Sequence, residues 1–146
     1  ASLFRDDRTS EATGEETLRF DPPLHLFERY ALEAVDLPGG VTLARGDKVA
    51  LLLAAANRDP ATYAAPDRFD PERFLDRAAK TVTSFGGGIH FCIGAPLARL
   101  ELRIALERLF ARCPGLALAG EPRYRDSWHF HGLERLEVAP GAVCRL

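Results

Sequence analysis

The sequence of 146 residues contains no methionine, a single tryptophan and no long run of apolar residues. Its longest apolar run covers only residues 49–56, whereas a helix that crosses a bilayer needs about 20 apolar residues. The N-terminus also lacks the basic and then apolar build of a secretory signal peptide. We therefore expect no membrane interaction and a cytoplasmic location.

Cysteine is scarce, and positive and negative charges nearly balance. The three cysteines, Cys92, Cys113 and Cys144, are odd in number and far apart, so they suggest neither a disulfide framework nor a paired-cysteine zinc or redox site. We expect such a chain to tolerate a reducing compartment. The formal net charge of −2 gives no electrostatic reason to expect nucleic acid as a partner.

The residues that are present are typical of one soluble globular domain. Apolar residues make up 47% and charged residues 27% of the chain, which are ordinary proportions for such a domain. A chain of this length can bury a modest core but is small for enclosing a large cofactor. Because it begins at Ala1 and has no methionine, we also expect it to be a truncated part of a longer protein.

Local patterns predict a mixture of helices and short strands. Capping and acidic residues indicate a helix over residues 10–20, and Pro96 begins an apolar helical repeat that ends at Cys113. Turn signals separate three strands, and the strand over 49–56 should be well buried. The other expected elements are strands over 26–35 and 41–44, a loop-rich tract from residue 57 with a short helix around 61–63, and short strands over 116–146.

One cysteine, Cys92, lies in a glycine-rich loop directly before the second predicted helix. A sulfur at a helix N-terminus is stabilised as its anion by unpaired backbone N–H groups and the helix dipole, which prepares it as a metal ligand. Glycines let the backbone approach a flat ligand closely. The spacing F-x-x-G-x-H-x-C-x-G, followed by Leu97-Ala98-Arg99, resembles the haem-ligand loop of the cytochromes P450, whose cysteine is the axial iron ligand.

A second motif strengthens this resemblance. Glu16 and Arg19 lie three residues apart and so share one face of the first predicted helix; alone, this spacing indicates only a surface ion pair. Beside the cysteine loop, however, Glu16-Thr17-Leu18-Arg19 resembles the E-x-x-R motif of the P450 family, and residues 70–74 resemble the segment whose arginine completes a Glu-Arg-Arg cluster. The resemblance implies that Glu16, Arg19 and Arg73 form a buried structural network.

The resemblance also assigns a cofactor and its contacts. It implies haem b, with Cys92 as the catalytic residue and the metal ligand, and with Arg29 and His90 donating hydrogen bonds to the haem propionates. The alternatives are an exposed strand residue for Arg29 and a loop histidine bonded to backbone for His90. The other implied haem contacts are Phe85, Gly88 and Gly94.

The implied activity is that of a haem-thiolate monooxygenase, which inserts one oxygen atom of O2 into an apolar organic substrate with electrons from a ferredoxin-type donor and its reductase. Arg99 and Arg103 are expected on the outer face of the helix after the loop, where they could dock such a donor or simply be solvated. Six positions are implied to face the substrate, with ordinary strand packing as an equal alternative: Leu24, His25, Leu26, Phe27, His129 and Phe130.

The resemblance covers roughly residues 15–138 and corresponds only to the C-terminal part of the P450 fold. That fold is α+β and mainly helical, and this part holds the E-x-x-R helix, a small β-sheet, the haem-ligand loop and the following helix. The long helix that carries the acid–alcohol pair for oxygen protonation has no match before Glu15. We therefore expect residues 1–146 to be the C-terminal portion of an incomplete P450 domain that, alone, binds haem poorly.

Two further functional classes remain open at this stage. Cys92 could be a nucleophile with His129 or His131 as its base, although no orienting partner or oxyanion site is marked nearby. The chain could instead be a non-catalytic P450-like remnant or a partner-interaction module. A dinucleotide-binding fold is disfavoured, because Gly86-Gly87-Gly88 lacks the third glycine of the G-x-G-x-x-G spacing.

Overall fold

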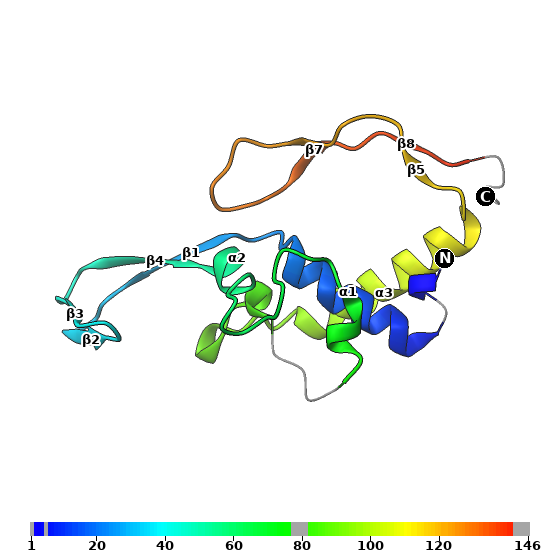
Figure 1. Cartoon of the computed structure of the whole chain (residues 1–146). Coiled ribbons are helices and arrows are strands. Elements are labelled where there is room, and N and C mark those ends of the chain that lie inside the picture. The colour runs from blue at the N-terminus through cyan, green and yellow to red at the C-terminus, as the bar shows by residue number, and fades with distance from the viewer. Residues whose placement is uncertain (1, 5, 77–81, 142–146) are drawn as a thin grey trace.

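A computed structural model describes residues 2–4, 6–76 and 82–141 of the chain. Its helices and strands confirm the predicted α+β class (Figure 1). In chain order they are η1 (Ser2–Phe4), α1 (Asp7–Phe20), β1 (Leu26–Tyr30), β2 (Val35–Leu37), β3 (Val41–Leu43), β4 (Lys48–Leu52), α2 (Leu53–Ala56), η2 (Pro71–Phe74), η3 (Thr83–Phe85), η4 (Gly88–His90), α3 (Ala95–Arg112), β5 (Ala117–Leu118), β6 (Arg123–Tyr124), β7 (Leu133–Arg135) and β8 (Val138–Ala139).

Helix α1 starts earlier than its sequence pattern predicts because Asp6 caps it. The Asp6 carboxylate accepts a hydrogen bond of 2.8 Å from the Thr9 backbone N–H, and the Thr9 hydroxyl accepts one of 3.2 Å from the Asp6 N–H. This reciprocal capping satisfies two backbone donors that the helix itself cannot. The helix ends at the predicted place, where Asp21 precedes two prolines that cannot continue the backbone hydrogen bonding.

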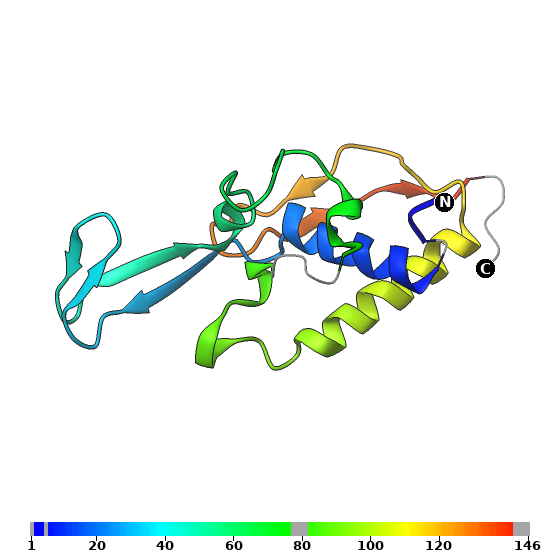
Figure 2. The same ribbon diagram turned by 60° about the horizontal axis from the view of Figure 1, so that its bottom comes forward.

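Helices α1 and α3 lie side by side (Figure 2). The face that α3 turns toward α1 is not the expected one. Arg99 pairs with Glu15, and Arg103 Nη1 lies 3.0 Å from Asp7 Oδ1. The prediction that these two arginines point outward is therefore wrong. The opposite side is left apolar and open, since the side chain of Leu97, for example, is 59% exposed. Acidic residues on α1 draw the arginine side of α3 inward, so the apolar repeat predicted from Pro96 onward does not form a broad buried face.

Within residues 2–4, 6–76 and 82–141, the strands form four separate two-stranded antiparallel sheets. Strands β1 and β4 form a long hairpin that projects from the helices, with β2 and β3 at its far end (Figure 1). The expected single well-buried strand over residues 49–56 is wrong in two ways. Only Val49 of β4 is even half-buried, because a two-stranded ribbon has no third strand beside it. Residues 53–56 form helix α2 instead, as their alanines favour.

Residues 57–76 form the irregular tract that the sequence predicts. The expected short helix around 61–63 is wrong, because these residues form one turn in which the Thr62 and Tyr63 N–H groups both donate to the Asp59 carbonyl. Tyr63 is buried beneath this turn. The backbone carbonyls of the tract therefore need partners other than a regular helix or sheet.

The segment of residues 116–141, here called the C-terminal arm, contains the predicted short strands. Strand β5 pairs with β8 and β6 pairs with β7, and together they form an arch that returns toward the start of β1 (Figure 1). Cys113, just before the arm, is disulfide-bonded, so the expectation that the cysteines form no disulfide is wrong. Among the described residues, no helix is long and apolar enough to cross a membrane.

Candidate functional site

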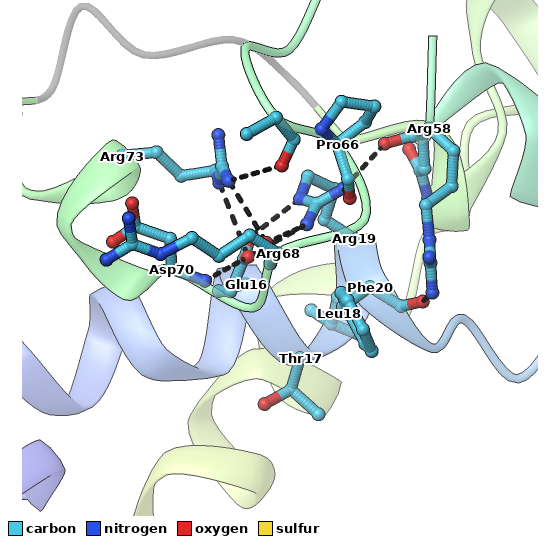
Figure 3. A network of polar contacts seen from close by, with 12 residues as sticks. Glu16, Thr17, Leu18, Arg19, Phe20, Arg58, Pro66, Arg68, Asp70 and Arg73 are labelled. Carbon is cyan, nitrogen blue, oxygen red and sulfur yellow. Dashed lines mark hydrogen bonds and ion pairs between the residues drawn. The ribbon is translucent and has the colours of Figure 1, made fainter. Parts of the chain in front are cut away.

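A buried charged cluster joins α1 to the irregular tract (Figure 3). Arg19 binds Glu16 through two hydrogen bonds, of 2.6 Å from Nε and 2.8 Å from Nη2, and both side chains have no exposed surface. Arg73 Nε adds a third contact to the same carboxylate at 3.3 Å. The backbone N–H of Asp70 donates to Glu16 Oε1 at 2.6 Å. The structure thus brings together all three residues that the sequence assigned to one network.

The two guanidinium groups of this cluster also bind the irregular tract. Arg19 donates to the carbonyls of Asn57, Pro66 and Arg68 at distances of 2.9, 2.9 and 3.2 Å. Arg73 donates to the Arg68 carbonyl at 3.1 Å and to others beside it. Buried charges are tolerated only when they are paired and fully hydrogen-bonded. The tract is irregular because its carbonyls turn inward to meet that requirement.

The cysteine loop follows from η3 to the start of α3. Cys92 carries an exposed free thiol; its N–H donates to the Phe85 carbonyl at 3.0 Å, and its carbonyl accepts from the Ala95 N–H at 3.1 Å. The second bond joins the cysteine to the first turn of α3. A Cβ atom on Gly94 would lie 3.7 Å from the Cys92 sulfur, so the absence of a side chain leaves the space beside the sulfur open.

Two polar residues that sequence reasoning missed, Asn57 and Ser84, attach this loop to the helices. The Asn57 side chain donates to Ser84 Oγ at 2.9 Å and accepts from the Thr83 N–H at 2.8 Å. Ser84 Oγ in turn donates to the Leu18 carbonyl of α1 at 2.5 Å. Because Asn57 also gives its carbonyl to Arg19, one residue connects the charged cluster with the cysteine loop. An asparagine after an alanine-rich run carried no signal of this role.

Gly86 brings the loop against strand β1. Its φ of 73° lies in the region that L-residues rarely adopt, and a Cβ there would lie 3.3 Å from the Phe27 ring. Residues two apart on a strand share a side, so Arg29 stands on the same side of β1 as Phe27. The Arg29 guanidinium carbon lies 5.1 Å from the Phe27 ring centroid, and Nη1 donates to the Glu28 carbonyl at 2.9 Å.

The surface around the thiol is apolar and open. The side chains of Ile89 and Ile93 are 97% and 100% exposed, and Phe91 between them is also exposed. Phe85 packs edge-on against Phe91, and the Arg99 guanidinium lies over the Phe85 ring. A thiol among exposed apolar side chains and glycine backbone, with exposed His90 at its edge and Arg29 on the adjoining strand, fits a flat apolar ring system that bears acidic groups.

Four of the six predicted substrate-facing residues meet between the start of β1 and the C-terminal arm. Leu24 and Phe130 form an isolated antiparallel bridge, and the His25 N–H donates to the His129 carbonyl at 2.8 Å. The other two, Leu26 and Phe27, pair with β4 instead. Burial and the nearby His131 ring lower the pKa of His25.

A histidine base for Cys92 gains no support from this geometry. His131 Nε2 lies 3.3 Å from Asp21 Oδ1, and its ring stacks against Tyr124 and His25. These contacts hold the imidazole at the start of β1. His131 is one of the two possible bases in the nucleophile hypothesis. Its partners are Asp21, Tyr124 and His25, which do not belong to the cysteine loop.

A buried Glu-Arg-Arg cluster joined to a cysteine loop before a helix defines a class of protein, and comparisons with known proteins identify it. The family model for cytochrome P450 matches residues 10–119. The chain is 46% identical over 125 residues to the biotin biosynthesis cytochrome P450 of Bacillus subtilis, with 85% of the chain and 30% of the relative covered. It is 43% identical over 146 residues to cytochrome P450 107B1 of Saccharopolyspora erythraea, with 97% and 35% covered. The chain belongs to the cytochrome P450 family.

Solved structures give the same result. The crystal structure of P450BioI in complex with an acyl carrier protein ligated to hexadec-9Z-enoic acid matches with a TM-score of 0.81 and 43% identity, over 92% of this chain and 34% of that one. CYP109E1 of Bacillus megaterium in complex with corticosterone matches with a TM-score of 0.84 and 33% identity, over 97% and 37%. The predicted family and fold are therefore confirmed, and the chain spans about a third of the length of these relatives.

Proposed function

We propose that this chain provides the haem-binding, C-terminal portion of a cytochrome P450 monooxygenase, with Cys92 as the axial ligand of haem b. The observation that carries the proposal is an exposed free thiol, joined by its own carbonyl to the first turn of α3 and surrounded by exposed apolar side chains. When bound, a thiolate-ligated haem supplies oxygen activation, and the family reaction inserts one atom of O2 into an apolar organic substrate. Cys92 is the catalytic residue in this proposal.

Each remaining loop residue has a defined task. Phe85 accepts the Cys92 N–H through its carbonyl and fixes the direction of the sulfur. Gly88, with a φ of 62° and nothing near its missing Cβ, leaves the loop surface flat, and Gly94 does the same beside the sulfur. Arg29 and His90 donate hydrogen bonds to the two propionates, because carboxylates beside an apolar ring need charge-assisted donors.

The charged cluster acts at a distance from the chemistry. Glu16, Arg19 and Arg73 hold the irregular tract in place. Asn57 connects this tract to the cysteine loop through hydrogen bonds with Thr83 and Ser84. These three charged residues are positioning residues rather than catalytic ones. Their effect on Cys92 is to fix where the loop lies relative to α1.

The substrate side is formed where the arm meets β1. Leu24 and Phe130 lie together there, beside His129, with Leu26 and Phe27 further along the strand. An apolar organic molecule is the substrate class that these side chains suit. Electrons come from a ferredoxin-type donor with its reductase in the cytoplasm. Arg99 and Arg103 do not dock that donor, because both are committed to ion pairs with α1.

A second candidate, a partner-interaction module derived from a P450, is favoured by one observation. The outer side of α3 exposes Leu97, Leu100 and Ile104 by 59%, 45% and 44%, and apolar patches of this kind often mark interfaces. Haem binding through Cys92 separates the two candidates. A module that keeps the fold but not the cofactor leaves the thiol unligated.

Alkylation of the thiol tests the haem-binding proposal. The full chain is treated with iodoacetamide at a series of hemin concentrations, and the Cys92 peptide is quantified by mass spectrometry. We expect rapid alkylation of the exposed thiol without hemin and protection that increases with the hemin concentration, because an iron-bound sulfur is not a free nucleophile. Metal-free protoporphyrin is the matched control and should protect far less. Equal alkylation with and without hemin would reject Cys92 as the ligand.

A further inference from the structure

A second group of ligating side chains lies away from the cysteine loop. Asp21 at the end of α1, His25 before β1 and His131 in the C-terminal arm each offer one ligand atom, and these atoms all lie within 4.8 Å of one another. His131 Nε2 is 3.3 Å from Asp21 Oδ1, and the His25 and His131 ring centroids are 4.5 Å apart. The cluster therefore joins two segments that are distant in sequence, residues 21–25 and the C-terminal arm.

The backbone holds these segments in place independently of the side chains. The Leu24–Phe130 bridge is flanked by two hydrogen bonds, from His25 N–H to the His129 carbonyl at 2.8 Å and from His131 N–H to the Pro23 carbonyl at 3.0 Å. Tyr124 stacks on the His131 ring with centroids 4.0 Å apart. The positions of both histidines are thus set before any ligand binds, which lowers the entropic cost of forming a site.

The chemistry of the cluster suits a first-row divalent cation. Two imidazoles and one carboxylate are ligands that zinc, iron and cobalt ions accept, with further positions left for water. With metal–ligand bonds of about 2.0–2.1 Å, neighbouring ligand atoms of a tetrahedral site lie about 3.3 Å apart. The Asp21–His131 pair already has this spacing. The three ligand atoms lie within 4.8 Å of one another, so the His25 ring has to tilt to bring its nitrogen to the same spacing.

The His25 ring lies near the backbone carbonyl of Pro22. Metal-ligating histidines usually donate one ring N–H to a carbonyl or carboxylate, so this carbonyl is a suitable acceptor for the ring nitrogen that does not bind the ion. Asp21 is exposed and both histidines are half-buried, so an ion can enter from solvent without any rearrangement of the core.

We propose that Asp21, His25 and His131 form a site for a divalent transition-metal ion that clips the C-terminal arm to the end of α1. The site is separate from the haem proposed at Cys92 and does not depend on it. It assigns the side chain of His25 to the ion rather than to the substrate. The strands of the arm pair with one another. An ion at the bridge between the arm and residues 21–25 therefore adds a cross-link between the arm and the rest of the fold.

Cobalt binding to the full chain is the direct test, since Co²⁺ occupies zinc-type sites and reports its ligands by absorption. We expect one equivalent to bind with visible d–d bands and without the near-ultraviolet charge-transfer band of a cobalt–thiolate bond. The second feature distinguishes this site from Cys92. Zinc should displace the cobalt and should slow proteolysis within residues 121–139, because the clip holds the arm.

Substitutions identify the ligands. Asp21→Asn is close to isosteric and preserves the fold, and His131→Gln removes one imidazole; each should weaken cobalt binding roughly tenfold or more. His129→Gln is the matched control, because only the backbone carbonyl of that residue takes part in the bridge, and it should bind cobalt like the parent. Circular dichroism checks that every variant is folded. A thiolate band, equal binding by Asp21→Asn, or no binding up to roughly millimolar cobalt would each overturn the proposal.

Discussion

At the scale of single residues, the largest effects belong to the charged cluster. Glu16 balances two arginines, Arg19 and Arg73, and has no exposed surface. We expect Glu16→Gln to lower the free energy of unfolding by about 3–5 kcal/mol, because it leaves buried positive charge without a counter-charge. Urea denaturation followed by circular dichroism measures this loss.

An exposed ion pair provides the control for that measurement. Asp67 pairs with Arg58 at 2.8 Å, but its side chain is 87% exposed. Asp67→Asn should therefore cost less than about 1 kcal/mol. Similar losses for Glu16→Gln and Asp67→Asn would show that burial of the cluster does not govern its contribution.

Tyr63 gives the cluster a signature at alkaline pH. Burial raises the pKa of the Tyr63 hydroxyl above its ordinary value of about 10, with the nearby Arg19 acting in the opposite direction. A raised folded-state pKa means that the unfolded chain releases this proton first, so the stabilisation is complete below about pH 10 and is lost as the pH rises through the folded-state value.

Tyr63→Phe isolates this effect. The free energy of unfolding of the parent chain should fall more steeply between about pH 9 and pH 11 than that of the variant, and the difference between them is measured by urea titration at each pH. Parallel pH profiles for the two chains would contradict the assignment. The Arg19 guanidinium carbon lies 5.2 Å from the Tyr63 ring centroid. The titration of Tyr63 therefore reports on the charged cluster.

At the scale of elements, the cysteine loop depends on its contact with β1. Gly86→Ala places a Cβ 3.3 Å from the Phe27 ring at a φ of 73°, which costs about 1–3 kcal/mol of strain. We expect this variant to lose that much stability by urea denaturation and to bind hemin more weakly, because the loop shifts away from β1.

The neighbouring glycine separates strain from a general effect of alanine in the loop. Gly87 has extended backbone angles, and a Cβ there meets nothing within 4 Å. Gly87→Ala should leave stability unchanged or raise it slightly, since it restricts the unfolded chain. If both alanine variants behave alike, the Phe27 contact does not define the loop.

The arrangement of the elements also explains which site residues could be predicted from the sequence and which could not. The motif residues Glu16, Arg19, Arg73 and Cys92 were found because their spacing is local and specific. Asn57 and Ser84 were missed because their partners lie 26 to 66 residues away in the chain, and no local pattern encodes such pairs. The orientation of α3 was wrong for a similar reason, since acidic residues of α1 decided which side of it faces inward.

At the scale of the whole molecule, the charged cluster and the cysteine loop form one hydrogen-bonded unit. The charged cluster fixes the irregular tract, Asn57 connects that tract to the cysteine loop, and the loop presents an exposed thiol on an apolar surface. The arm and β1 meet on another edge, at the Leu24–Phe130 bridge. The chain has the architecture of its family over the third of a P450 that it spans.

The central claim is that the Cys92 thiolate is the iron ligand, and the carbon monoxide difference spectrum of the reduced, hemin-loaded chain tests it most directly. The band position reports the ligand of whatever fraction of haem is bound, so weak binding does not obscure the answer. We predict the strongly red-shifted Soret band of a thiolate ligand in the parent chain and in His129→Gln, and its disappearance in Cys92→Ser. The same red-shifted band in Cys92→Ser, or a histidine-type band in the parent chain, would contradict the account.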